Sequence, residues 1–203
     1  EAAANILLST YLICILTISV FVGCGSTSSE DMKLKYEPLS EKEIRIFNLT
    51  GDKIAMYEIK NIPEGIGIKV DISYELYEGD VKIKEELIAG IATGGPTEKE
   101  TDLKFGINIQ DKKIRTNISM GGGMSSNEID IDLNLREMSH GFLGSDEELK
   151  LGDEVYLFHG AKGNGFSPID LGVNIDEKVI KERLTNHESN FLIKLSIKEI
   201  TES

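Results

Sequence analysis

Few side chains in this 203-residue sequence have the types and spacing that catalysis or metal binding requires. The three histidines, His140, His159 and His187, stand 19 and 28 residues apart, so the sequence contains no short His-x-x-x-His metal pair. Ser139 adjoins His140, but neighbours in sequence do not make a nucleophile and its base, and no Gly-x-Ser-x-Gly motif occurs. We therefore expect no catalytic residue, no metal ligand and no cofactor, and we interpret the histidines as surface or strand-end residues.

Glycine-rich segments and one pair of aspartates are the other patterns that suggest chemistry. Segments 89–97, 120–124 and 160–167 are rich in glycine, but no helix is expected to start directly after them, as a phosphate-binding loop requires. Asp130 and Asp132 stand two apart on one expected strand face, where they could contribute to a calcium site. They lack the spacing and the glycine of an EF-hand loop. We interpret the segments as loops between strands and the aspartates as part of a solvated face.

Cys24 stands where a long apolar run becomes polar. Residues 6–22 carry no charge, and these 17 residues would rise about 25 Å as a helix. A membrane span needs about 20 such residues, whereas the hydrophobic part of a secretory signal is shorter. Glycine, serine and acidic residues follow Cys24, so the apolar run is interpreted as a signal for export.

Phe21, Val22, Gly23 and Cys24 resemble the cleavage motif of bacterial lipoprotein signal peptides. In that motif an apolar, a second and a small residue precede a cysteine that receives a diacylglycerol before cleavage. The resemblance covers about the first tenth of the chain. It implies that 1–23 is a signal peptide and that Cys24 is the lipid attachment site, with acyl chains such as palmitate that hold the protein on the extracytoplasmic face of the cell membrane. An uncleaved N-terminal anchor is the alternative.

The cysteine count and the net charge restrict the mature protein further. Cys14 lies inside the expected signal peptide, so the mature chain would have no thiol except that of Cys24. This excludes a disulfide framework, a thiol nucleophile and a cysteine-based zinc site. The formal net charge of −13 argues against nucleic acid binding, because the surface repels phosphate backbones.

The chain after the signal is expected to form a tether, 24–42, and one β domain, 43–203. Apolar and polar residues alternate along most of that domain, which is typical of half-buried antiparallel strands. Short turns at Gly79-Asp80 and at Asp111-Lys112 predict hairpins. The alternating stretches are 66–76, 81–91, 103–109, 114–120, 129–135 and 191–197; together with shorter strands expected at 44–49, 53–59 and 154–158, they predict eight or nine strands. One short helix is expected at 176–184.

These patterns predict an all-β, mainly antiparallel fold: a β-sandwich, immunoglobulin-like or jelly-roll-like, with at most one short helix. We expect a membrane-anchored, non-catalytic interaction domain for a protein or cell-wall ligand. The alternative is a lipid-anchored hydrolase or carbohydrate-active enzyme, which would need two facing carboxylates in a cleft. If contact is made by loops, the candidates are 94–98, 121–126 and 160–167, and at least two of them must gather at one end.

Overall fold

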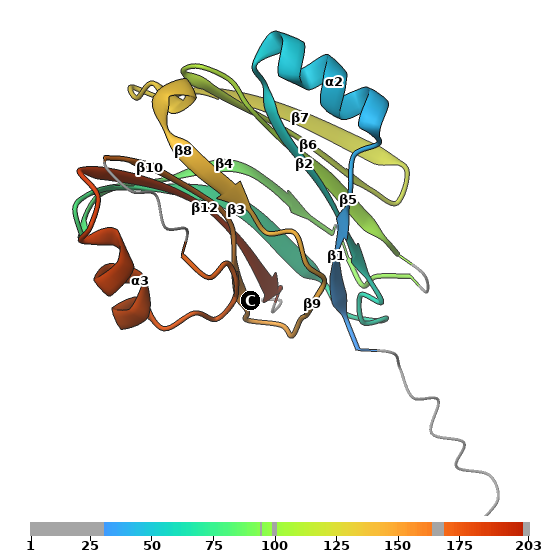
Figure 1. The fold of residues 1–203 in the computed structure, drawn as a ribbon. Helices are drawn as coiled ribbons and strands as arrows, with labels where there is room; N and C mark the ends of the chain where they lie inside the picture. The colour runs from blue at the N-terminus through green and yellow to red at the C-terminus, as the bar shows by residue number, and fades with distance from the viewer. Residues whose placement is uncertain (1–30, 94, 99–100, 164–168, 201–203) are drawn as a thin grey trace, which may run out of the picture. The chain divides into compact units, whose positions relative to one another are not determined.

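Alternating side chains build most of the chain into antiparallel strands, as Figure 1 shows for the computed structural model, which describes residues 31–93, 95–98, 101–163 and 169–200. The described residues belong to one unit, Asp31–Ser203. The strands are β1 (Lys33–Glu37), β2 (Lys53–Lys60), β3 (Ile68–Glu78), β4 (Val81–Ala92), β5 (Leu103–Ile109), β6 (Lys113–Met120), β7 (Gly123–Asp130), β8 (Ser139–Phe142), β9 (Glu147–Glu148), β10 (Glu154–Lys162), β11 (Gly172–Val173) and β12 (Ser189–Glu199).

The strands form two sheets that pack face to face. Sheet A has the order β7-β6-β5-β2-β1-β9, and sheet B has the order β11-β10-β12-β3-β4, with β8 also paired to β10. Every pairing is antiparallel. The inward side chains of both sheets make one apolar core, for example Tyr57 and Phe105 of sheet A and Ile72 and Phe191 of sheet B. The predicted all-β, sandwich-like fold is confirmed.

The two predicted hairpins are confirmed. Glu78 pairs with Val81 across Gly79 and Asp80, and Gly79 has a φ of +58°, a left-handed conformation that suits glycine in a two-residue hairpin turn. Asp111 and Lys112 lie in the turn between β5 and β6, where the Gln110 amide donates to the Lys113 carbonyl at 2.9 Å. Both turns set the register of the strands that they join.

The strand expected at 44–49 is wrong, because these residues belong to helix α2 (Glu41–Thr50). Ser40 caps the helix: its side chain accepts from the Glu43 amide, and the Glu43 carboxylate accepts from the Ser40 amide at 2.8 Å. This reciprocal capping box favours a helix start, and Gly51, with a φ of +75°, ends the helix. The local capping signals therefore outweigh the β-branched isoleucines.

Two short helices are present among the described residues, so the expectation of at most one is also wrong. The second, α3 (Glu177–Leu184), was predicted, and Asp176 caps it by accepting from the Lys178 amide at 2.7 Å. The strand expected along 129–135 is wrong beyond Asp130, where β7 ends: residues 131–134 are not in a strand, and Leu135 begins a 3-10 turn, η1 (Leu135–Glu137). No helix in the described part of the chain is long and apolar enough to cross a membrane.

The predicted tether is too long. Residues 33–37 form β1, which pairs with both β2 and β9, and Leu34 is fully buried in the core. The side chains of Leu34 and Tyr36 face inward, and those of Lys33 and Lys35, which alternate with them along β1, face outward. Residues 33–42, expected in the tether, therefore supply an inner strand of sheet A and the start of α2.

Candidate functional site

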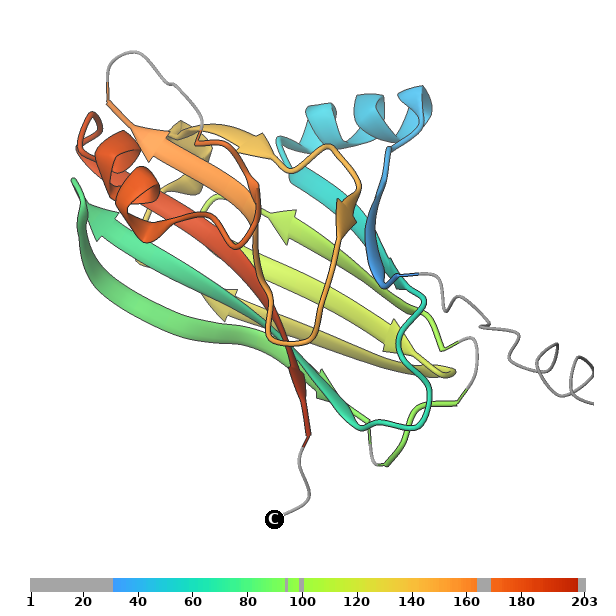
Figure 2. The same cartoon turned by 90° about the horizontal axis from the view of Figure 1, so that it is seen from below.

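The outer face of sheet B is covered at one end by α3, and this cover creates the most chemically distinctive site of the described domain. α2 lies on the outer side of sheet A (Figure 1), and α3 lies on the outer side of sheet B (Figure 2). A second apolar cluster fills the space beneath α3; its members are Tyr77, Tyr156, Ile169, Ile180, Leu184 and Leu192. A face that would otherwise be solvated is therefore partly buried.

Glu75 lies on this outer face and is completely buried. Its carboxylate accepts hydrogen bonds from the Tyr77 hydroxyl at 2.8 Å and from Lys82 Nζ at 2.7 Å. The Tyr156 hydroxyl donates at 3.4 Å, and Lys194 Nζ lies 3.2 Å away. Four donors from four strands thus converge on one carboxylate, which a buried charge requires.

Lys194 joins this carboxylate to the rim of the site. Its side chain is only 9 % exposed, and its Nζ also lies 3.3 Å from Glu154 and 3.5 Å from Glu85. Lys82 bonds Glu85 as well, at 3.0 Å. The two lysines therefore tie β3, β4, β10 and β12 together through shared carboxylates.

The charges of this network shift one another's pKa values. Burial alone would raise the pKa of Glu75, but the hydrogen bonds from Lys82 and Tyr77 and the charges of Lys194 and Lys82 outweigh it and lower the pKa. Burial would lower the pKa of Lys194, yet the nearby glutamates raise it. The pKa of Lys82 is raised in the same way, by Glu75 and Glu85. All three groups are therefore charged at neutral pH.

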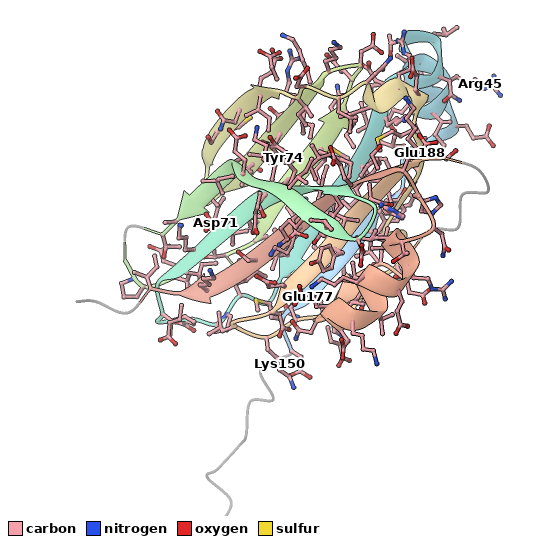
Figure 3. All side chains as sticks on the ribbon, turned by 90° about the vertical axis from the view of Figure 1, so that its left-hand side faces the viewer. Arg45, Asp71, Tyr74, Lys150, Glu177 and Glu188 are labelled. Carbon is pink, nitrogen blue, oxygen red and sulfur yellow. The ribbon has the colours of Figure 1, made fainter. Side chains whose placement is uncertain are left out.

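A pocket of about 390 Å³ opens over this network; it is lined by Glu75, Tyr77, Lys82, Glu154, Tyr156, Asn174, Ile175, Glu177 and Lys194. Glu177 comes from the first turn of α3 and is labelled in Figure 3. Three acids and two lysines line the walls, so the pocket suits a polar ligand that is neutral or cationic.

The carboxylates of Glu75 and Glu154 both line this pocket, and the upper limit of their spacing falls in the range of the catalytic pairs of glycoside hydrolases. Lys194 Nζ lies 3.2 Å from Glu75 Oε1 and 3.3 Å from Glu154 Oε2, so these two oxygens are at most 6.5 Å apart. Catalytic carboxyl pairs occur at about 5 to 9.5 Å. A general acid, however, needs a raised pKa, whereas that of Glu75 is lowered. The ammonium of Lys194 also occupies the space between the two groups.

The structure gives the three histidines different surroundings. His159 is fully buried; its Nδ1 accepts from the Ile169 amide at 3.2 Å, and its Nε2 donates to Asn190 Oδ1 at 3.1 Å. Burial lowers its pKa to about 4, and the Asn190 bond offsets this only in part. The rings of His159 and His187 lie 6.0 Å apart, which sequence spacing did not indicate. His140 is exposed and stacks on Phe158 at 5.9 Å.

Asp130 and Asp132, interpreted as part of a solvated face, are both exposed. Asp130 ends β7 and lies 3.8 Å from Lys113, while Asp132 follows the strand. Among the residues that the structure describes, no group of three or more His, Cys, Asp or Glu side chains is placed to hold a metal ion. Cys24, the predicted lipid attachment site, lies outside the described residues.

The predicted contact loops divide between the two ends of the sandwich. The connection 61–67 joins the Lys60 end of sheet A to the Ile68 end of sheet B, and the Thr97 amide donates to the Ile66 carbonyl. Residues 95–98 and the turn at Gly121-Gly122 therefore lie at this end, because Met120 pairs with Leu103. Lys162 pairs with Ser189 at the opposite end, so residues 160–163 do not join them, and residues 164–167 lie outside the described part of the chain. Segment 121–126 is mostly strand β7, not a long loop.

An apolar groove of about 430 Å³ lies beside α2. Its walls are mainly aliphatic and aromatic: Tyr36, Pro38, Leu39, Ile44, Phe47, Ile54, His140 and Phe142, with Asn48, Gly51, Asp52 and Lys53. No residue of α2 is buried, and Leu49 on its surface is 88 % exposed. This groove offers mainly apolar contact, and Asp52, Lys53 and His140 are its titratable residues.

Sequence reasoning missed the Glu75 site, although one signal for it exists. Strands β10 and β12 carry large apolar residues on the outer face of the sheet as well, Tyr156 and Leu192. Such strands require a cover on the outer side of their sheet. Glu75 itself looks like any polar residue between the inward Tyr74 and Leu76.

Comparisons of the chain with models of protein families, with curated proteins and with solved structures found no match.

Proposed function

We propose that this chain is an extracytoplasmic lipoprotein whose β-sandwich is a non-catalytic binding module. The anchor is a diacylglycerol on Cys24, as the residues Phe21 to Cys24 suggest by their resemblance to lipoprotein signals. Eight residues lie between Cys24 and Lys33 of β1, and even fully extended this stretch of chain spans only about 30 Å. On this proposal the domain works close to the membrane surface.

The pocket around Glu75 is the observation that carries the binding role. Its floor is preorganised, because the buried carboxylate already has four donors and does not rearrange when a ligand arrives. Glu154, Glu177 and Asn174 line the pocket above that floor. We propose a polar ligand with hydroxyl or amino groups, such as a fragment of a cell-wall polymer.

The protonation states in the pocket favour binding over catalysis. Glu75 has a lowered pKa and does not serve as a general acid at neutral pH. Lys82 and Lys194 have raised pKa values, so their amines stay protonated and are not nucleophiles. The second candidate, a carbohydrate-active hydrolase, is favoured only by the spacing of at most 6.5 Å between Glu75 and Glu154 oxygens.

Binding is tested by titrating the isotopically labelled chain from Cys24 to Ser203 with soluble peptidoglycan fragments. We expect amide shifts to cluster at Glu154, Asn174 and Glu177, and the Glu154→Gln variant to bind several-fold more weakly. A matched control is Glu148→Gln, which changes an exposed glutamate on β9, outside the pocket. Shifts confined to other regions would refute the site, and cleavage of the fragments would establish the hydrolase instead.

Anchoring is tested separately by mass spectrometry of the chain produced in a bacterial host. We expect the mature N-terminus to be an acylated Cys24, and we expect Cys24→Ala to release the domain from the membrane fraction. Membrane-bound protein with an intact Gly23–Cys24 bond would indicate a retained anchor. An unmodified, soluble Cys24 chain would contradict membrane anchoring altogether.

A further inference from the structure

The outer face of sheet A differs in charge from the chain as a whole. Because Leu34, Tyr57 and Phe105 point into the core, the residues that alternate with them point outward. The outward cations are Lys33, Lys35, Lys60, Lys104, Lys113 and Arg115. The outward anions are Glu37, Glu58, Glu128, Asp130 and Glu148. Cations therefore exceed anions by one on this face, whereas the chain has a net charge of −13.

The cations of this face pair with carboxylates in two groups. Glu58 bonds both Lys60 and Lys104, each at 3.0 Å, so this group keeps one positive charge. Glu128 bonds Lys113 at 2.7 Å and also pairs with Arg115, while Asp130 lies 3.8 Å from Lys113. The second group is therefore neutral, and the excess positive charge lies at the group of Glu58.

Apolar side chains project from the same side of the domain. α2 lies on the outer side of sheet A (Figure 1), and Figure 3 shows Arg45 pointing away from the sheets. Ile46 and Leu49 are 47 % and 88 % exposed and lie three residues apart on one helix face. Met124 of β7, on the outer face of the sheet, is 80 % exposed. Lysine or arginine beside exposed apolar residues is the combination that membrane-surface elements use.

The chain also enters the domain on this side. β1 lies near the edge of sheet A, between β2 and the two-residue strand β9. At most about 30 Å of chain separates Lys33 from Cys24. An anchor on Cys24 would therefore hold sheet A within reach of the bilayer. At the end of the domain where the chain enters, the acids Asp31, Glu64, Glu98, Asp102 and Glu199 lie among the lysines of the strand ends, Lys69 and Lys198 included, so this end has no excess of cations.

From these observations we propose that the outer face of sheet A, with α2, lies on the anionic lipid surface that holds the anchor. This inference rests on the proposed lipid anchoring. In this orientation the lysines and Arg115 meet the lipid phosphates, and Leu49, Ile46 and Met124 enter the headgroup layer. Sheet B and the Glu75 pocket then face away from the membrane, since the two sheets turn opposite faces outward.

Lysine acetylation read by mass spectrometry tests the orientation, because each face carries its own lysines. The chain from Cys24 to Ser203 has a single cysteine, which is coupled to a maleimide lipid, so that this test does not depend on natural acylation. The vesicles contain phosphatidylglycerol with phosphatidylcholine, or phosphatidylcholine alone. We expect Lys104 and Lys113 to be acetylated about threefold more slowly on the anionic vesicles, and this protection to vanish at about 1 M salt. Lys178 of α3 and Lys198 of β12 should react as they do in solution.

Lys113 separates the orientations, because it lies on the far end of sheet A from Lys60 and Lys104. Protection of Lys69 and Lys198 without Lys113 would mean that the domain stands on its end, and would overturn the proposal. Protection of Lys178 and Lys181 would place sheet B on the lipid and overturn it equally. Equal reactivity on both kinds of vesicle would show that the face does not recognise anionic lipid.

Matched variants test the apolar contribution without disturbing the core. Leu49→Ser with Met124→Ser should reduce the protection of Lys113 at least by half, because both side chains are exposed and serve no packing role. Leu87→Ser with Val179→Ser is the control: these residues are 52 % and 44 % exposed on sheet B and α3. An effect of the control pair equal to that of the test pair would refute the proposed face. Urea unfolding of each variant verifies that it folds.

Discussion

The carboxylate of Glu75 and the ammonium of Lys194 form a salt bridge of 3.2 Å beneath α3, where both side chains are more than nine-tenths buried. The two residues lie on neighbouring strands, β3 and β12, 119 positions apart in sequence. Buried ion pairs contribute little net stability relative to apolar residues, but removal of one partner leaves an uncompensated buried charge. The consequences of breaking this pair are therefore large and measurable.

Glu75→Gln is expected to lower the free energy of unfolding by about 3 kcal/mol, because Lys194 and Lys82 would lose the carboxylate that they share. Urea unfolding at pH 7 measures this loss. Glu148→Gln, an exposed change of the same kind, should have almost no effect. The double variant Glu75→Leu with Lys194→Met should be more stable than the sum of its single changes predicts, and strict additivity would contradict the coupling.

The lowered pKa of Glu75 sets the sign of a pH dependence. The unfolded carboxyl group takes up a proton at a higher pH than the folded one, so the stabilisation is complete above the ordinary pKa of about 4.5 and is lost as the pH falls through the lower folded value. We expect unfolding free energies measured from pH 6 to pH 3 to fall less steeply in Glu75→Gln than in the parent chain. A slope that the substitution leaves unchanged would mean that other groups carry the acid response.

His159 produces a second pH dependence at milder acidity. Burial lowers its pKa from about 6.5 to about 4, so the folded state excludes a proton that the unfolded chain binds. Between these values the domain should lose up to about 3 kcal/mol of stability as the pH falls. His159→Leu should be less stable at pH 7, because the Ile169 amide and Asn190 lose their partner, but its stability should change less between pH 6.5 and pH 4.5. An unaltered slope in this window would exclude His159 as its source.

Ser40→Ala is expected to remove the capping box of α2 at a cost of about 1 kcal/mol to the helix. Since no residue of α2 is buried, little else holds the helix in place. Hydrogen exchange of amides in the second turn should accelerate about fivefold, while amides of the core strands keep their rates. Ser126→Ala, at an exposed position of β7, is the control. Unchanged exchange in α2 would show that the cap does not stabilise it.

Local patterns in the sequence predicted those strands and hairpin turns that depend only on neighbouring residues. Alternation along 66–76 and 191–197 predicted β3 and β12, and the two short turns predicted their hairpins, because side-chain period and turn chemistry are properties of neighbouring residues. The strand expected at 44–49 failed because apolar alternation was given more weight than the capping box at Ser40 and Glu43, which was itself visible in the sequence. The tether was drawn too long because β1 has only five residues.

The sequence by itself determined the sandwich-like β fold and led to the expectation that Cys24 carries a lipid. Only the tertiary structure decided which of the 35 acidic residues becomes a buried site. Glu75 acquires its role from Lys82 across the β3–β4 hairpin, from Lys194 on β12 and from Tyr156 on β10. The register of strands far apart in sequence creates this arrangement, and alternation of side chains carries no information on which strands become neighbours. The same reason hid the positive face of sheet A, since its charges come from strands that pair only after folding.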